Sequence, residues 1–191
     1  MQALMMQSQL MISSILTHAE KNFPDVEMVS VTVDNPRHRQ NYKTFAKRCR
    51  QLANVLSSLG AKFGDRIGTL AWNDYRHMEL YYGISGSGMV CHTINPKLFP
   101  EQVSYIINHA EDKILFADVL VMPLLEALKA HLGKVEAIVV MTDSAHMPES
   151  TLPNVLCYEE LLAEQSDDFD WPEVDENTAS GMCYRSGTTG N

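Results

Sequence analysis

The residues with the clearest chemical potential form the run Ser186-Gly187-Thr188-Thr189-Gly190. Glycines adopt backbone angles that are closed to other residues, and serine and threonine hydroxyls donate hydrogen bonds to oxygen. Such a run is typical of loops that wrap an anion, with phosphate as the obvious candidate. It is not a Walker loop, because no GxxxxGK[ST] pattern occurs and the residue after Gly190 is Asn191 and not a lysine. The sequence therefore predicts a phosphate-binding loop of another kind.

A strand is expected directly before this loop. The segment 179–184 is rich in small residues and is typical of a buried strand. In an open parallel sheet, ligands bind beyond the carboxyl ends of the strands. A strand that leads straight into the loop would place the loop where a nucleotide site needs it.

The end of the chain resembles a family signature. The AMP-forming acyl-CoA synthetases carry Tyr-Thr-Ser-Gly-Thr-Thr-Gly, and this chain matches it from Tyr184 to Gly190 at every position except Arg185. Six blocks that resemble the medium- and long-chain fatty-acyl-CoA synthetase branch precede it in order: Gly64-Asp65-Arg66, Trp72-Asn73, Arg76-His77-Met78-Glu79, His92-Thr93-Ile94-Asn95-Pro96, Leu98-Phe99-Pro100-Glu101-Gln102 and Ile107-Asn108-His109-Ala110-Glu111-Asp112. The resemblance runs from about Asp25 to the last residue, and ordered blocks are far more specific than one short loop.

The resemblance implies both a fold and a reaction. The fold would be α/β, with a largely parallel sheet flanked by helices, as part of the N-terminal domain of an acyl-adenylate-forming enzyme. The intact enzyme would use ATP, Mg²⁺ and CoA: a fatty acid or related carboxylate attacks the α phosphorus of ATP with loss of pyrophosphate, and the CoA thiol then displaces AMP. By matched position, Ser186, Gly187, Thr188, Thr189 and Gly190 would bind the departing phosphates.

The resemblance also sets expectations for assembly and activity. Members of this branch are commonly dimers, so a homodimer is expected. The family's adenine, metal-glutamate, ribose-aspartate and C-terminal lysine motifs are not among these 191 residues. We therefore expect the chain to be an N-terminal portion that is inactive by itself, and no catalytic residue is assigned.

Several alternatives stay open. Arg185 stands where the family has a small hydroxyl residue; an arginine can pair with phosphate, but it would repel magnesium and crowd the site, so no metal ligand is assigned. A Ser/Thr/Gly string at the end of a chain can also be a disordered tail. The acid could be aromatic or short and branched, or the chain could be a non-catalytic α/β module that dimerises through its N-terminal arm.

Composition narrows the class of protein. The net charge of −9 argues against nucleic acid or an anionic membrane surface as the main partner. Polar residues interrupt the methionine- and leucine-rich segment 1–16, so that it contains no apolar span of membrane length. A cytoplasmic protein without a transmembrane segment is expected. The seven histidines include no HxxxH pair, so zinc is not expected. Reduced and mostly buried thiols are expected for the four cysteines, Cys49, Cys91, Cys157 and Cys183.

Strands and helices are expected to alternate, which predicts parallel strands with right-handed crossovers. Helices are expected from about residue 11 to Phe23 and at 43–59, 75–88, 101–109, 119–131 and 158–164. Strands are expected at 29–33, 67–72, 89–94, 113–117, 135–141 and 180–184, with a loop at 142–153. The expected divisions are an N-terminal arm with a helix and a strand (1–40), an α/β subdomain (41–166), an acidic linker (167–179), and a strand with a truncated phosphate-binding loop (180–191).

Some residues invite a functional interpretation but favour a structural one. Gly83, Gly86 and Gly88 occur as GxxGxG late in a helix, unlike a dinucleotide fingerprint, so close helix packing is expected. His77 and His109 belong to no evident acid-base pair and are expected to make structural hydrogen bonds. Core or interface positions are expected for the aromatic residues Trp72, Tyr81 and Tyr82.

Overall fold

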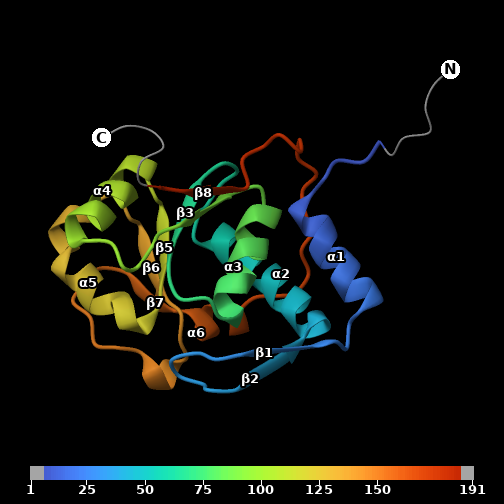
Figure 1. Ribbon diagram of the computed structural model, residues 1–191, viewed down its shortest axis with the longest axis horizontal. Coiled ribbons are helices and arrows are strands. Elements are labelled where there is room, and N and C mark those ends of the chain that lie inside the picture. The colour runs from blue at the N-terminus through green and yellow to red at the C-terminus, as the bar shows by residue number, and fades with distance from the viewer. Residues whose placement is uncertain (1–6, 186–191) are drawn as a thin grey trace.

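The fold is built on one parallel sheet of six strands with helices on both faces (Figure 1). The computed structural model describes residues 7–185. The strand order is β7-β6-β5-β3-β4-β8, and every neighbouring pair is parallel. The strands are β3 (Arg66–Leu70), β4 (Val90–Thr93), β5 (Ile114–Ala117), β6 (Ala137–Val140), β7 (Val155–Cys157) and β8 (Gly181–Cys183). This architecture confirms the predicted α/β fold.

Helices bury the sheet from two sides. On one face lie α2 (Tyr42–Ser58), α3 (Tyr75–Gly86) and α6 (Tyr158–Ala163); on the other lie α4 (Pro100–Ala110) and α5 (Met122–Ala127). The chain runs from β3 through α3 to β4 on one side, and then returns through α4 to β5 on the other side of β3. Because such crossovers are right-handed, connections that move in opposite directions across the sheet place their helices on opposite faces. The N-terminal helix α1 (Ile12–Asn22) packs outside this layer, against α2 and α3.

The predicted helix over 43–59 shows how the sequence dictates an element. Phe45, Cys49, Leu52 and Leu56 recur at helical spacing and are buried in α2. The side chain of Asn41 caps the first turn by accepting a hydrogen bond from the amide of Thr44 at 2.9 Å. Two residues beyond the last helical one, Gly60 has φ of +80°, the left-handed conformation that glycine supplies at a helix end.

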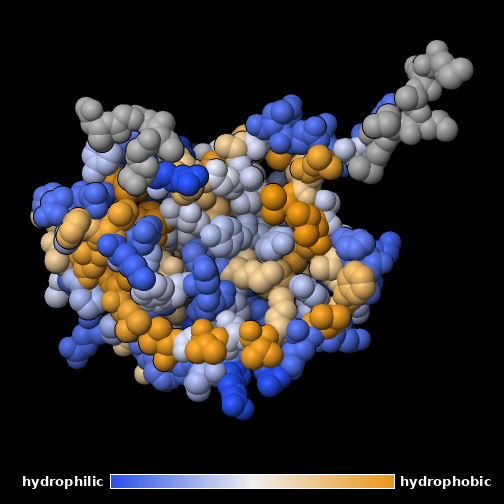
Figure 2. Space-filling model, viewed as in Figure 1, coloured by the Kyte–Doolittle hydropathy of each residue, from blue (hydrophilic) through white to orange (hydrophobic). Residues whose placement is uncertain are grey.

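The first strand prediction is wrong in extent and in burial. The observed strand β1 (Glu27–Ser30) pairs antiparallel with an unpredicted strand, β2 (His38–Asn41), in a separate two-stranded sheet. Three valines expected to be half-buried, Val29, Val31 and Val33, are exposed by 55%, 70% and 51%. They contribute to a hydrophobic band along the lower rim of the molecule, over β1 and β2 (Figure 2). Alternation shows that two faces differ, but not which one the rest of the chain covers.

Two further elements differ from expectation. The predicted helix over 119–131 is broken into a 3₁₀ turn η1 (Val119–Val121), α5 and a second 3₁₀ turn η2 (Lys129–His131). The edge strand β7 was not predicted because its three residues lie between a polar loop and α6. A third 3₁₀ turn, η3 (Ser144–His146), lies in the predicted loop.

The glycines at the end of α3 leave room for different neighbours. A Cβ atom on Gly83 would lie 2.6 Å from Cδ2 of Leu52, which confirms close packing against α2. A Cβ atom on Gly86 would instead lie 2.8 Å from the Trp171 ring. Gly88 follows the helix with φ of +78°. The small residues therefore let α2 and the acidic segment approach α3 closely.

The acidic segment after α6 carries the chain back across the molecule to β8. Asn54 of α2 donates hydrogen bonds to the carbonyl oxygens of Ser166 and Asp168 at 2.9 and 3.0 Å. Arg50 donates to the carbonyl oxygen of Asp167 at 2.9 Å. These contacts lead the chain from one edge of the sheet to the other, where β8 pairs with β4.

A buried network of ion pairs joins α2, α3 and α6. Arg48 binds Glu79 at 2.7 Å and Glu159 at 2.9 Å, and the side chain of Glu79 is fully buried. The hydroxyl of Tyr158 donates to Glu79 at 2.8 Å. Arg76 binds Glu159 at 2.8 Å, so the chain of opposite charges continues through α3.

The same network holds the β1–β2 hairpin against the sheet. Arg76 binds Asp34, in the connection between β1 and β2, at 3.0 Å, and it donates to the carbonyl oxygen of Met141 at 3.1 Å. The hydroxyl of Thr142 also donates to Asp34 at 3.1 Å. Burial alone would raise the pKa of Asp34, but hydrogen bonds from Arg76 and Thr32 hold it well below its usual range. Asp34 is therefore a charged anchor.

The network predicts a strong effect of removing one buried charge. Glu79→Gln keeps the shape of the side chain but leaves the guanidinium of Arg48 only partly compensated. We expect the free energy of unfolding, measured by urea denaturation, to fall by about 2–4 kcal/mol. The matched control is Arg39→Ala, which breaks the exposed ion pair with Glu27 and should change stability by less than about 0.5 kcal/mol. Equal effects of the two substitutions would contradict a structural role for the network.

Candidate functional site

The strand order places a crevice at the carboxyl edge of the sheet. The connections from β3 and β4, through α3 and α4, leave toward opposite faces, and such a reversal opens the sheet edge to ligands. A cavity of about 320 Å³ lies at the carboxyl ends of β3, β4 and β8. Its lining comes from three strand ends and from α3: Ala71, Trp72, Asn73, His77, Tyr81, Thr93, Ile94, Asn95, Pro96, Cys183 and Tyr184.

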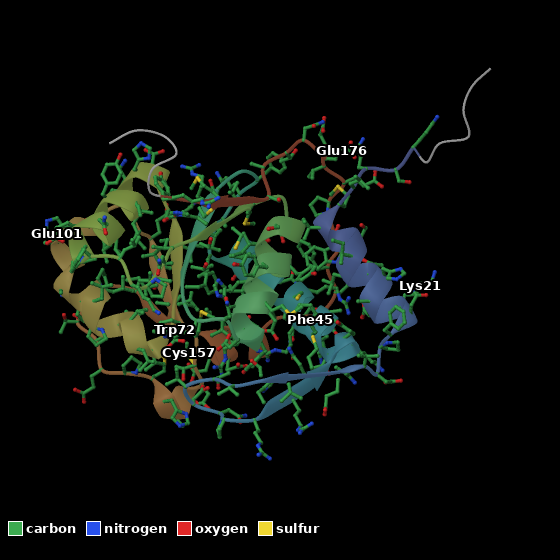
Figure 3. The ribbon with its side chains drawn as sticks, in the orientation of Figure 1. Lys21, Phe45, Trp72, Glu101, Cys157 and Glu176 are labelled. Atoms are coloured by element: carbon green, nitrogen blue, oxygen red, sulfur yellow. The ribbon has the colours of Figure 1, made fainter. Side chains whose placement is uncertain are left out.

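Two aromatic residues that were expected at core or interface positions form part of this crevice. Trp72 and Tyr81 are each 42% exposed, so neither lies in the core of the described structure. Trp72 follows β3, and Lys97 lies over its ring at 5.7 Å from the centroid. Trp72 is labelled in Figure 3. The crevice therefore offers ring faces beside the polar groups of Asn73 and Asn95.

His77 organises the crevice and does not serve as a free base. Its Nε2 lies 3.0 Å from the hydroxyl of Thr69, and its Nδ1 lies 3.1 Å from the carbonyl oxygen of Trp72. Burial lowers the pKa of His77, which favours the neutral ring. Both nitrogens are therefore used to fix the segment that follows β3. This geometry confirms the structural role expected for His77.

The strand expected to carry the phosphate loop is present as β8, but the prediction that it is buried is wrong. β8 lies at the edge of the sheet with Gly181 and Cys183 exposed, because it has a neighbouring strand on one side only among the described residues. β8 pairs parallel with β4, and Met182 stands opposite His92. Cys183 and Tyr184 then reach the crevice at the carboxyl end of the strand. The five predicted phosphate-binding residues, Ser186, Gly187, Thr188, Thr189 and Gly190, lie outside the described residues.

Arg185 and Tyr184 border a second cavity, on the side of α4. This cavity has a volume of about 390 Å³, and its other lining residues are Leu98, Glu101, Gln102, Tyr105 and Ile106. Arg185 is exposed there. Tyr184 lines both cavities, so it stands between the crevice and α4.

Sequence reasoning missed a buried histidine–aspartate pair beneath this strand. Nδ1 of His92 on β4 lies 2.8 Å from each carboxylate oxygen of Asp112, and both side chains are fully buried. Burial raises the pKa of Asp112, and the hydrogen bond from His92 opposes that rise. The two residues belong to different matched blocks, but only the return of the chain after α4 brings them together.

The described residues give little support for a magnesium site at the crevice. Mg²⁺ prefers carboxylate, phosphate and water oxygens, and no carboxylate is among the lining residues of the crevice. Within residues 7–185, one group could hold a metal ion, namely Asp34, Asp143 and His146, but Asp34 already pairs with Arg76. The crevice is thus suited to hold a ligand by shape and hydrogen bonds.

All four thiols are free; Cys49, Cys91 and Cys157 are buried, and Cys183 is exposed, which confirms the expectation of reduced, mostly buried thiols. None of the helices within residues 7–185 combines the length and hydropathy that a bilayer-crossing segment needs.

Curated proteins similar to this chain are acyl-CoA ligases. The chain is 46% identical over 187 residues to a 3-methylmercaptopropionyl-CoA ligase of Ruegeria lacuscaerulensis, covering 98% of this chain and 35% of the relative. It is 44% identical over 187 residues to a medium-chain-fatty-acid–CoA ligase of Ectopseudomonas oleovorans, covering 98% and 34%. It is 41% identical over 186 residues to a long-chain-fatty-acid–CoA ligase of Thermus thermophilus, covering 97% and 33%. The chain spans about a third of the length of these relatives.

Solved structures share the fold. An anthranilate CoA ligase in complex with anthranoyl-AMP superposes with a TM-score of 0.81 at 23% identity, covering 100% of this chain and 35% of that one. A fatty acyl CoA synthetase of Mycobacterium tuberculosis gives a TM-score of 0.71 at 22% identity, covering 92% and 32%. The model of the family described as AMP-binding enzyme matches residues 16–191. The chain therefore belongs to the AMP-binding enzyme family.

Proposed function

We propose that this chain supplies the phosphate-binding strand and loop of an ATP-dependent ligase that activates a carboxylate as acyl-AMP and transfers it to CoA. The observation that carries the proposal is the position of β8. This strand is parallel to β4, reaches the carboxyl edge of the sheet beside the crevice, and runs directly into the Ser/Thr/Gly-rich run. The reaction asks the protein mainly to position the polyphosphate and to neutralise its charge.

The roles of individual residues follow from that chemistry. Backbone amides and the hydroxyls of Ser186, Thr188 and Thr189 would donate hydrogen bonds to the β and γ phosphates, and the two glycines would allow close approach. Arg185, exposed one residue earlier, adds positive charge. Mg²⁺ would accompany ATP in the whole enzyme, but the crevice residues described here supply no carboxylate for it.

The acid is proposed to be a medium- or long-chain fatty acid. Two of the similar relatives are named for such acids, whereas a third is named for 3-methylmercaptopropionate. The similarity to an anthranilate ligase rests on the fold alone and does not favour an aromatic acid. ATP and CoA would be the other substrates of the whole protein, and its compartment is proposed to be the cytoplasm.

The whole protein is also proposed to be a homodimer that uses the N-terminal arm. On α1, Ile15 is 54% exposed, and Leu10 just before the helix is 72% exposed. These apolar side chains would be covered by a partner. Light scattering of the chain with and without residues 1–23 should show a dimer in the first case and a monomer in the second; equal masses would contradict the role of the arm.

The central test is whether this chain binds polyphosphate through the loop. Calorimetric titration with inorganic pyrophosphate should show binding, and Thr188→Ala combined with Thr189→Ala should weaken it about tenfold to a hundredfold, because two hydrogen bonds to a charged group are lost. Thr17→Ala is the control, since its hydroxyl donates only within α1. Failure of the unmodified chain to bind pyrophosphate, or equal binding by the double variant, would contradict the proposal.

Activity of the isolated chain is a separate outcome. We expect no acid-dependent exchange of pyrophosphate into ATP by these 191 residues, because they correspond to only a third of the similar ligases. Detection of such exchange would show that the catalytic groups are contained in this chain.

A further inference from the structure

Tyr184 is held by α4 at the point where β8 ends. Its hydroxyl lies 2.5 Å from Nδ1 of His109, and the two rings meet edge to face with centroids 5.7 Å apart. His109 is itself stacked on Tyr105 one helical turn earlier, with ring centroids 5.3 Å apart. Tyr184 is the last residue but one before the predicted phosphate loop. The helix α4 thus holds the chain just after β8, two residues before the predicted loop begins at Ser186.

The side chain that packs against the ring of Tyr184 is itself held by a buried hydrogen bond. The Tyr184 ring lies 5.4 Å, centroid to centroid, from the ring of His92, which the carboxylate of Asp112 orients through Nδ1. A Cβ atom on Gly68 would lie 3.0 Å from Oδ2 of Asp112 and 2.5 Å from Cδ2 of Leu115. A side chain at this position of β3 would crowd both Leu115 and the carboxylate of Asp112. Two buried side chains and one glycine are therefore arranged so that a polar ring can lie beneath Tyr184.

β8 has little else to hold its carboxyl end. It has three residues, and among the described strands it pairs with β4 alone. Gly181 and Cys183 are exposed. An edge strand this short frays easily, because few backbone hydrogen bonds and little apolar burial oppose its opening. The side chain of Tyr184 is the group that ties this end to a helix.

We propose that Tyr184 is a positioning residue for the phosphate loop, held by His109 and supported by the His92–Asp112 pair. The inference rests on the proposed function and deepens it. The hydroxyl of Tyr184 need not touch a phosphate. It fixes the place and direction in which the chain leaves the sheet, which lowers the entropic cost of binding a polyphosphate beyond β8. The matched blocks around His92 and His109 thus act on the loop through Tyr184.

The first experiment compares two tyrosines in this chain. Tyr184→Phe keeps the ring over His92 and removes the hydrogen bond to His109. Amide hydrogen exchange at residues 182–185 should become about threefold to tenfold faster, and pyrophosphate affinity should fall by a similar factor, as expected for one lost hydrogen bond. The midpoint of thermal unfolding should not change. Tyr105→Phe is the control, because it keeps its ring stacked on His109 and should change neither quantity.

The second experiment tests the partner by rescue. His109→Ala removes the acceptor and should reproduce the faster exchange of Tyr184→Phe. His109→Asn should restore slow exchange, because asparagine carries a polar atom bonded to Cγ as histidine carries Nδ1. Combining His109→Ala with Tyr184→Phe should add nothing to either single change, since both remove the same hydrogen bond.

The outcomes separate this inference from the proposed function. If the unmodified chain binds no pyrophosphate, the proposed function fails, and with it the role of Tyr184 toward phosphate; exchange at 182–185 then shows whether the tyrosine still anchors β8. If pyrophosphate binds but Tyr184→Phe behaves like Tyr105→Phe, the inference alone is overturned. A drop in thermal stability with faster exchange throughout the sheet would also overturn it, because it would show a general structural role.

Discussion

The structure depends on one buried network of opposite charges. Glu79, fully buried on α3, is compensated by Arg48 of α2, and Glu159 of α6 links Arg48 to Arg76. Burying such charges is costly unless every partner is present, and the observed arrangement of the three helices and the hairpin satisfies all of them. The network thereby fixes the start of α3, and α3 in turn provides His77 and Tyr81 to the crevice. Charge pairing in the interior thus holds the helix that forms part of the crevice wall.

The polar and aromatic groups that could hold a nucleotide lie at the carboxyl edge of the sheet. His77 uses both ring nitrogens to fix the segment after β3, and β8 brings Cys183 and Tyr184 alongside β4. No acid-base pair is found among the described crevice residues, which suits a reaction that needs positioning more than proton transfer. Under the proposed function, the chain would contribute to adenylation through β8, the loop that follows it and the walls of the crevice.

The sequence predicted what depends on local pattern. The apolar spacing of α2, the alternation that makes the sheet parallel, and the strand before the glycine-rich run follow from neighbours in the chain. The pairing of Arg48 with Glu79, and of His92 with Asp112, could not be predicted, because it needs the three-dimensional return of the chain. The short strands β2 and β7 were missed for the same reason: pairing partners define them more than their own residues do. Trp72 and Tyr81 were expected at core or interface positions, because the size and apolarity of a side chain do not show that it lines a crevice beside the strand ends.

The account is tested most directly by mapping where ATP binds on this chain. In a nuclear magnetic resonance titration with ATP, amide shifts should change at residues 183–190 and at the crevice segments 71–73 and 93–96, while the exposed face of β1 and β2 should not respond. Shifts confined to other surfaces, or no shift at millimolar ATP, would contradict the claim that the carboxyl edge beside β8 is a polyphosphate site.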